Sequence, residues 1–134
     1  RIDAAVFGHI ETHKPLVDRI CQDLDIDLLL PIWKQNSEKI INEVLDAGFE
    51  VILVSVRDGL LGKEWLGRSI DDDFLADLRA ANSSVDACGE NGEFHTLVLD
   101  GPIFEKKMVI TKSDPVCREG YWFLNISEFS LQEK

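Results

Sequence analysis

The run that most constrains the fold of this 134-residue chain is "FEVILVSV", residues 49–56. Aliphatic and β-branched residues fill it almost without a break, which is typical of a strand buried on both faces of a parallel sheet. Two earlier runs, "AAVFGHI" at residues 4–10 and "IDLLLPIW" at residues 26–33, each indicate an apolar strand that ends in a loop. Together the three runs predict a sheet of parallel strands.

Helical periodicity fills the segments between these strands. Two sets of apolar residues recur at helical spacing: Leu16, Val17, Ile20, Cys21 and Leu24, and then Ile40, Ile41, Val44 and Leu45. Thr12 is a candidate N-cap for the first helix, Ser37 opens the second and Gly48 ends it. The order strand, helix, strand, helix, strand predicts βαβ crossovers and therefore an α/β fold with a Rossmann-like parallel sheet.

The last third of the chain has a different pattern. After a third, shorter helix around residues 74–78, the runs "FHTLVLDG", "IFEKKMVITK" and "GYWFLNISEF" are separated by turns, which predicts an antiparallel extension of the sheet. No repeat or long linker divides the sequence, so residues 1–134 are expected to form a single domain. Because the sequence has no initiator Met and enters a strand almost at once, we expect it to be part of a longer protein.

Charge and cysteine content narrow the function classes. Twenty-five acidic against fourteen basic residues give a formal charge of −11, which disfavours nucleic acid and membrane as direct partners and favours a cationic or polar ligand. The three cysteines form no CxxC pair, which indicates neither a disulfide framework nor a zinc ribbon and fits a reducing cytoplasm. No apolar run approaches the roughly 20 residues that cross a bilayer.

The strongest candidate for a site is "CGENGEFHT" at residues 88–96. Its glycines allow backbone N–H groups to turn toward a ligand, while Glu90, Asn91 and Glu93 present acceptors that could bind a polar or cationic group, orient an amine or hold a divalent ion. If Phe94 packs on the core, strand alternation places Glu93 and His95 together on the opposite face. The alternative is a glycine turn with solvated acids.

Other segments offer weaker candidates. Loops at the carboxyl ends of parallel strands share one edge, so we expect residues 8–10, 32–33 and 57–59 to line one crevice, unless their glycines only form turns and Trp33 only fills the core. Arg68, beside a glycine turn, suits a carboxylate or phosphate, although a surface salt bridge is the commoner use. Residues 71–73 are three adjacent acids, and they suit a helix N-terminus better than a metal.

At these same residues the chain resembles the diphthine–ammonia ligase family, ATP-binding proteins of the N-type ATP pyrophosphatase (PP-loop) group. The segments that carry the resemblance are "VFGHI", "LLLPIW", "EWLGRSID" and above all "CGENGEFHTLVLDGPIF", in the family's order over residues 4–104. The resemblance implies a sheet of the adenine nucleotide alpha hydrolase type, and this chain would be the carboxyl-terminal part of a longer ATP-binding enzyme.

The resemblance also implies a reaction. Members activate a carboxylate with ATP, with Mg²⁺ expected, release pyrophosphate, and let ammonia convert the acyl-adenylate to an amide. The carboxylate substrate is diphthine, a modified histidine of translation elongation factor 2 that carries a quaternary ammonium. Glu90 and Glu93 would offer opposite charge, and Trp65 or Phe94 an aromatic face. The resemblance leaves a homodimer open.

The family's functional residues map onto this sequence as follows. Glu90 and Glu93 take the catalytic positions of its glutamate–glycine signature, and the substrate-side positions fall on Gly67, Arg68, Gly89, Asn91, Gly92, His95 and Thr96. Asn91 replaces a common glycine, and His95 and His9 each replace a common acid. Gly8 is the one nucleotide-binding candidate, because the phosphate-gripping Ser-Gly-Gly-Lys-Asp-Ser motif does not occur in residues 1–134. No metal ligands are assigned.

Two other functions compete with this one. The chain could be a non-catalytic binding module that retains the acidic pocket without the nucleotide-binding half. It could also be a metal-binding regulatory domain built on Cys88, His95 and the two glutamates, although their spacing matches no standard site.

Overall fold

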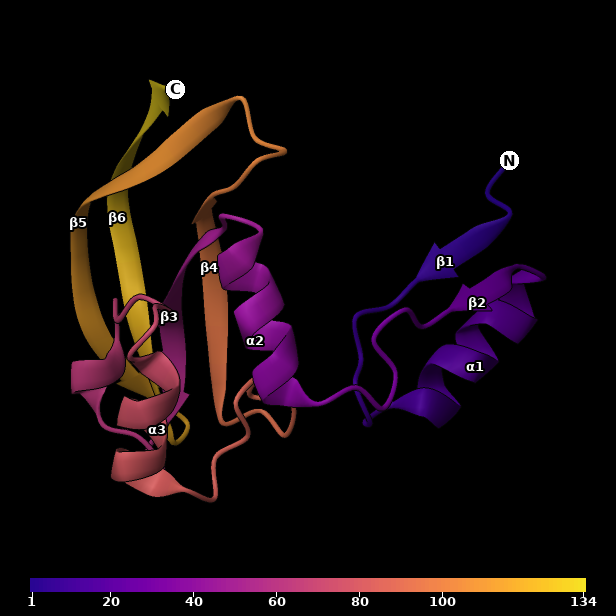
Figure 1. Cartoon of the computed structure of the whole chain (residues 1–134), viewed down its shortest axis with the longest axis horizontal. Helices are drawn as coiled ribbons and strands as arrows, with labels where there is room; N and C mark the ends of the chain where they lie inside the picture. Colours follow the sequence, from indigo (N-terminus) through magenta and orange to yellow (C-terminus); the bar gives the residue numbers. More distant parts are fainter.

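The structure is a computed structural model that describes residues 1–134. Figure 1 shows a small N-terminal unit, residues 1–35, beside a larger sheet with two helices. The elements are β1 (Ala4–Val6), α1 (Lys14–Leu24), β2 (Asp27–Leu29), α2 (Ser37–Asp46), β3 (Glu50–Arg57), the 3₁₀ turn η1 (Lys63–Trp65), α3 (Phe74–Asn82), β4 (Phe94–Asp100), β5 (Lys106–Arg118) and β6 (Tyr121–Glu133).

The N-terminal unit is one βαβ crossover. β1 and β2 pair in parallel, with Ala4 opposite Asp27, and α1 connects them. Of the five apolar residues whose spacing predicts α1, Val17 and Cys21 are buried, whereas Leu16, Ile20 and Leu24 are exposed, so the inward face is narrower than predicted. The predicted N-cap is wrong by one residue: His13 occupies the cap position with a positive φ of 60°, and no side chain caps the helix. Thr12 uses its hydroxyl elsewhere, at the candidate site.

The predicted placement of residues 49–56 in a parallel sheet is wrong. β3 pairs antiparallel with both β4 and β6, in a four-stranded sheet of order β4-β3-β6-β5, so the parallel pairing is limited to β1 and β2. An apolar run reports burial on both faces, and burial does not specify strand direction. The burial itself is confirmed, because Val51, Ile52, Leu53 and Val56 are all buried. The predicted antiparallel extension by the C-terminal strands is also confirmed.

The main core lies between β3, β4 and the two helices that follow the N-terminal unit. Ile41 of α2 and Leu78 of α3 pack into it. Phe74 and Phe94 are fully buried and meet edge to face, with ring centroids 6.1 Å apart, which joins the start of α3 to the start of β4. This contact fixes the end of the loop that carries the acidic residues.

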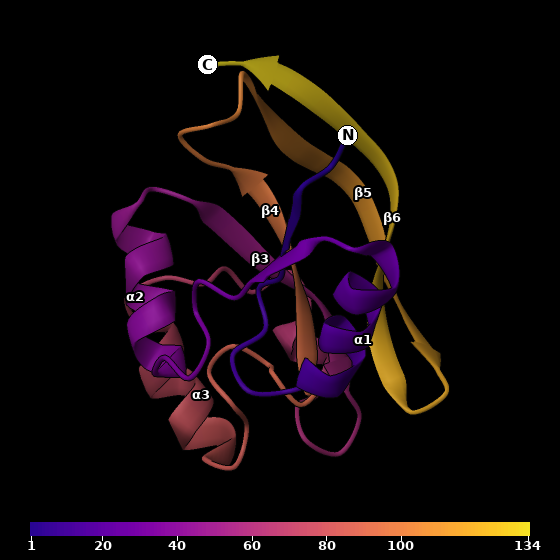
Figure 2. The same cartoon turned by 90° about the vertical axis from the view of Figure 1, so that its right-hand side faces the viewer.

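β5 and β6 form a long, curved hairpin along one edge of the sheet (Figure 2). β6 pairs with β3 only at residues 121–123, and the far end of the hairpin is held by ion pairs from Lys107 to Glu50 and from Lys134 to Asp100. The hairpin therefore reaches the rest of the molecule at two ends, and Tyr121 lies at the end near the acidic loop. None of the helices has the length and apolar character needed to cross a bilayer.

Candidate functional site

An apolar cavity of about 260 Å³ lies where the N-terminal unit meets α2 and β4. Its lining residues come from six segments of the chain: Gly8, Ile10, Ile32, Ile40, Ile41, Val44, Val51, Ile70, Cys88, Glu90, Phe94, Thr96 and Val98. Three of the predicted site residues, Gly8, Glu90 and Thr96, are therefore brought together. Glu90 is the one charged residue in this lining.

The acidic loop, residues 89–93, closes one side of this cavity. Its two glycines have positive φ angles, 67° at Gly89 and 76° at Gly92, a conformation that glycine adopts without steric cost. A Cβ atom on Gly89 would lie 2.7 Å from the carbonyl oxygen of Phe94, so a side chain has no room there. The glycines that the sequence singled out are thus required by the shape of the loop.

Glu90 extends from this loop to the N-terminal unit. Its Oε1 atom accepts hydrogen bonds from the backbone amides of Ile10 (2.9 Å), Glu11 (3.0 Å) and Thr12 (3.0 Å) and from the Thr12 hydroxyl (2.8 Å). Partial burial disfavours the charged carboxylate, but the hydrogen bonds from Glu11, Thr12 and Ile10 outweigh it and lower the pKa of Glu90 to about 2. Glu90 is therefore ionised at neutral pH.

Glu93 has a different environment from the one predicted. Only 4% of its surface is exposed. Oε1 accepts from the amide of Asp86 (3.1 Å) and the side chain of Asn91 (3.2 Å), and Oε2 accepts from the amide of Asn91 (2.9 Å). Oε2 thus holds the loop backbone at Asn91, and Oε1 joins the Asn91 side chain to the preceding turn at Asp86. The expected pairing of Glu93 with His95 on one face is wrong, because Glu93 is buried beside the loop and His95 is exposed.

Asp86 is a loop residue that the sequence reasoning missed. Its Oδ1 accepts from the amides of Cys88 (2.9 Å) and Glu90 (3.2 Å), and its Oδ2 accepts from the Ser37 hydroxyl at 2.7 Å. An aspartate that bonds the amide two residues later is a common turn signal, so a search for such turns would have found it. Asp86 therefore links the turn that precedes the acidic loop to the first turn of α2.

Cys88 lies beside Asp86 in this turn. Burial and the neighbouring Asp86 charge raise the pKa of the Cys88 thiol to about 11, so it stays protonated at neutral pH. Its Sγ donates to the carbonyl of Ser37 at 3.3 Å.

Arg57 and Tyr121 contact the acidic loop on another side. The Arg57 side chain donates to the carbonyl of Asn91 (3.2 Å) and to the Tyr121 hydroxyl (3.0 Å), and that hydroxyl donates to the carbonyl of Gly92 (3.1 Å). Residues 57–59 were expected to line one crevice with residues 8–10 and 32–33. Gly8, Ile10 and Ile32 line the cavity, whereas residues 57–59 do not. No pattern in the sequence indicated Tyr121 as a residue of the site.

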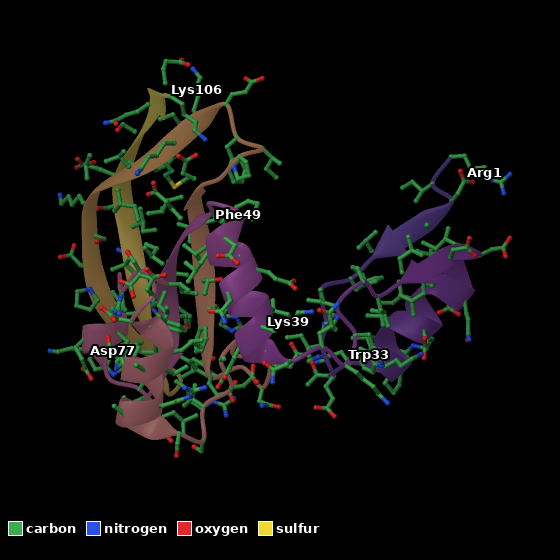
Figure 3. All side chains as sticks on the ribbon, in the orientation of Figure 1. Arg1, Trp33, Lys39, Phe49, Asp77 and Lys106 are labelled. Atoms are coloured by element: carbon green, nitrogen blue, oxygen red, sulfur yellow. The ribbon has the colours of Figure 1, made fainter.

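Two further predicted positions do not line the cavity. Figure 3 shows Trp33 in the N-terminal unit, near the segment that leads to α2, and it is not among the lining residues. His9 is not among the lining residues either, and its ring lies against that of His13 in a tilted arrangement, with centroids 5.2 Å apart.

Neither residue of the glycine–arginine pair of the second predicted loop lines the cavity beside the acidic loop. Arg68 forms ion pairs with Asp71 (2.6 Å) and Asp77 (2.8 Å), and hydrogen bonds to these carboxylates raise the pKa of its guanidinium. Gly67 lines a separate cavity between β3 and the β5–β6 hairpin. The N-cap of α3 is Asp73, the last of the three adjacent acids, and its side chain makes no capping hydrogen bond. Substrate contacts by Gly67 and Arg68 stay predictions.

The residues suggested for a metal site do not come together. No group of three or more His, Cys, Asp or Glu side chains has an arrangement that could hold a metal ion. Glu90 points to the N-terminal unit, Glu93 to its own loop, and His95 to the exterior.

Comparisons with known proteins bear on the same segments. The family model "Diphthamide synthase C-terminal domain" matches residues 36–132. The chain is 31% identical over 126 residues to the diphthine–ammonia ligase of Rattus norvegicus and 29% identical over 126 residues to that of Homo sapiens, which in each case covers 88% of this chain and 47% of the relative. It is 34% identical over 102 residues to the enzyme of Schizosaccharomyces pombe, covering 75% of this chain and 17% of the relative.

The fold and the site thus define an α/β chain whose glycine- and glutamate-rich loop closes an apolar cavity. The chain belongs to the diphthamide synthase family, and its match to the C-terminal domain confirms the resemblance stated from the sequence. It spans about half the length of the mammalian relatives it matches.

Proposed function

We propose that this chain is the substrate-side part of an ATP-dependent ligase that joins ammonia to a carboxylate, with diphthine as the carboxylate substrate. The family match and the names of the relatives support this assignment. The observation that carries it is the single ionised carboxylate of Glu90 in the lining of an otherwise largely apolar cavity.

The cavity suits a methylated ammonium group. Methyl groups lose their water favourably against apolar walls such as Ile10, Ile41 and Val98, whereas a primary ammonium would leave hydrogen-bond donors unmatched there. A carboxylate at the wall balances the fixed positive charge. Glu90 has one oxygen, Oε1, committed to the N-terminal unit, and its Oε2 takes no part in those hydrogen bonds. We assign Oε2 to the cation.

The two glutamates have separate roles in this proposal. Glu90 contacts the substrate, and Glu93 shapes the loop that presents Glu90, because both Glu93 oxygens bind loop atoms. Gly89 and Gly92 supply the loop conformation, and Thr96 contributes to the cavity wall. Catalysis by this chain then consists of binding the carboxylate substrate and orienting it for ammonia.

The residues of this chain do not fit the phosphates of ATP. The amides of Ile10, Glu11 and Thr12, which precede α1 and could bind an anion, already bind Glu90. The cavity beside them is apolar and carries a negative charge. We therefore place ATP and Mg²⁺ on a part of the enzyme outside residues 1–134, and expect this chain alone not to hydrolyse ATP. ATP supplies the activation of the carboxylate, and AMP, pyrophosphate and an amide are the products.

The test uses the complete gene product with ATP, ammonium and elongation factor 2 that carries diphthine. AMP and amide should appear in equal amounts, and only when all three components are present. Glu90→Gln should raise the KM for the protein substrate about tenfold, since it removes the charge that faces the cation. Glu128→Gln, an exposed acid on β6, is the matched control and should leave KM unchanged. Absence of AMP with the wild type would reject the proposal.

A non-catalytic binding module is the second candidate. The observation that favours it is that the hydrogen bonds of both glutamates end on the protein's own groups. Such a module should bind a trimethylammonium carboxylate in calorimetry but form no AMP with ATP and ammonium. A Ser-Gly-Gly-Lys-Asp-Ser motif encoded upstream of Arg1 would count against it.

A further inference from the structure

We propose that Arg57 and Tyr121 are positioning residues that bind the backbone carbonyls of the acidic loop, so that Glu90 faces the cavity. Neither residue lines the cavity, so any effect on a ligand must pass through the loop. The inference rests on the proposed function insofar as it assigns Glu90 to the substrate.

The contacts come from strand ends far from the loop in sequence. Arg57 closes β3 and Tyr121 opens β6, and the two residues are opposite each other in the antiparallel ladder. The backbone amide of Arg57 also donates to the carbonyl of Glu93 at 2.7 Å. Three consecutive loop carbonyls, those of Asn91, Gly92 and Glu93, therefore bind to this pair.

The direction of these hydrogen bonds is determined by the chemistry of the groups. A tyrosine hydroxyl has one hydrogen, and the Gly92 carbonyl can only accept, so Tyr121 donates to Gly92. The same hydroxyl must then accept from Nε of Arg57, which can only donate. The guanidinium also lies over the Tyr121 ring, 5.5 Å from its centroid. Each side chain thus holds the other in place.

The backbone conformation at Gly92 favours glycine. Its φ of 76° disfavours any side chain, although a Cβ atom there would make only ordinary contacts, 3.5 Å from Nη2 of Arg57 and 3.8 Å from the Tyr121 hydroxyl. The loop is thus bound on two sides, by Arg57 and Tyr121 at its carbonyls and by residues 10–12 at the Glu90 carboxylate. Weakening the contacts of Arg57 and Tyr121 should therefore weaken the hydrogen bonds between Glu90 and residues 10–12.

The experiment compares Tyr121→Phe and Arg57→Lys with the wild type in the complete gene product. Ser127→Ala is the matched control, because it removes one hydroxyl from the same strand, where it bonds only Lys112 of the same hairpin. The first readout is hydrogen–deuterium exchange of the peptide that contains residues 10–12. Exchange there should be about fivefold faster in both variants and unchanged in the control, while a peptide from residues 51–56 stays as protected as in the wild type.

The second readout is steady-state kinetics with the diphthine-bearing protein. Both variants should raise its KM about fivefold, with kcat and the KM for ATP within twofold of the wild type. In the double variant this KM should rise by no more than about tenfold, because the two residues act through one loop.

Four results decide the outcome. Unchanged exchange at residues 10–12, or faster exchange everywhere including residues 51–56, overturns the positioning role whatever the activity. Faster local exchange with an unchanged KM for the protein substrate also overturns it. If the two variants show faster exchange at residues 10–12 but the wild-type protein forms no AMP, the positioning of the loop is supported and only the proposed function is rejected.

Discussion

The hydroxyl of Thr12 donates a hydrogen bond of 2.8 Å to Glu90, a residue 78 positions later in the chain. All hydrogen bonds between the N-terminal unit and the rest of the chain end on this one carboxylate. The cavity lies beside the same junction. A single side chain therefore both joins the two parts and supplies the charge at the cavity. Its replacement should weaken the contact between the N-terminal unit and the rest of the chain together with the proposed binding of the cation.

Glu93→Gln should destabilise the protein, because a buried carboxylate with three hydrogen bonds becomes an amide that can accept at only one atom. We expect a loss of about 1–3 kcal/mol in the free energy of unfolding. Urea denaturation of the purified variant measures it. Glu128→Gln, at an exposed position, is the control and should change the value by less than about 0.5 kcal/mol. A wild-type value for Glu93→Gln would contradict a role in holding the loop.

The contribution of Glu90 to the stability of the folded protein should depend on pH within a defined range. Its pKa in the folded protein is about 2, below the ordinary value of 4.5, so its ionised form is favoured by folding. The stabilisation is complete above about pH 4.5 and is lost as the pH falls toward 2. Thermal melts of the wild type and Glu90→Gln should therefore differ most at pH 7, and the difference should shrink steadily between pH 4.5 and pH 2.5. A difference in melting temperature that stays constant from pH 7 to 2.5 would show that the charge is not responsible.

Gly89→Ala should be more harmful than Gly59→Ala. Both glycines have positive φ angles, 67° and 84°, so both variants carry backbone strain of about 1 kcal/mol. Only Gly89 also has a neighbour in the way, the Phe94 carbonyl oxygen 2.7 Å from the added Cβ, whereas Gly59 has open space. Chemical denaturation should show the larger loss for Gly89→Ala. Equal losses would mean that the loop shifts without cost.

The three cysteines should differ in reactivity. Cys117 is exposed, Cys21 is buried, and burial together with the Asp86 charge raises the pKa of Cys88 to about 11. The thiolate is the reactive form, so iodoacetamide at pH 7.5 should label Cys117 first. Peptide mass spectrometry over time gives the order. Asp86→Asn should speed the labelling of Cys88, and faster labelling of Cys88 than of Cys117 in the wild type would contradict the environment described for it.

Local patterns in the sequence were sufficient for the elements and for the loop. The spacing of Val17 and Cys21 located α1, and the run at residues 49–56 located a strand buried on both faces. The clustering of Gly89, Glu90 and Gly92 marked the loop that borders the cavity, because positive-φ turns and exposed acceptors depend on residues close together in the chain. The family resemblance also rested on these segments and was confirmed.

Only the tertiary structure decided how these pieces are joined and what each acid does. The antiparallel pairing of β3 depends on β4 and β6, which are remote in sequence, and burial alone does not reveal direction. Glu90 and Glu93 look alike in the sequence, yet one binds a turn 78 residues away and the other its own loop. The contacts of Arg57 and Tyr121 exist only because β3 and β6 meet. Hydrogen bonds between distant residues follow from the packing of whole elements, and no short pattern encodes that packing.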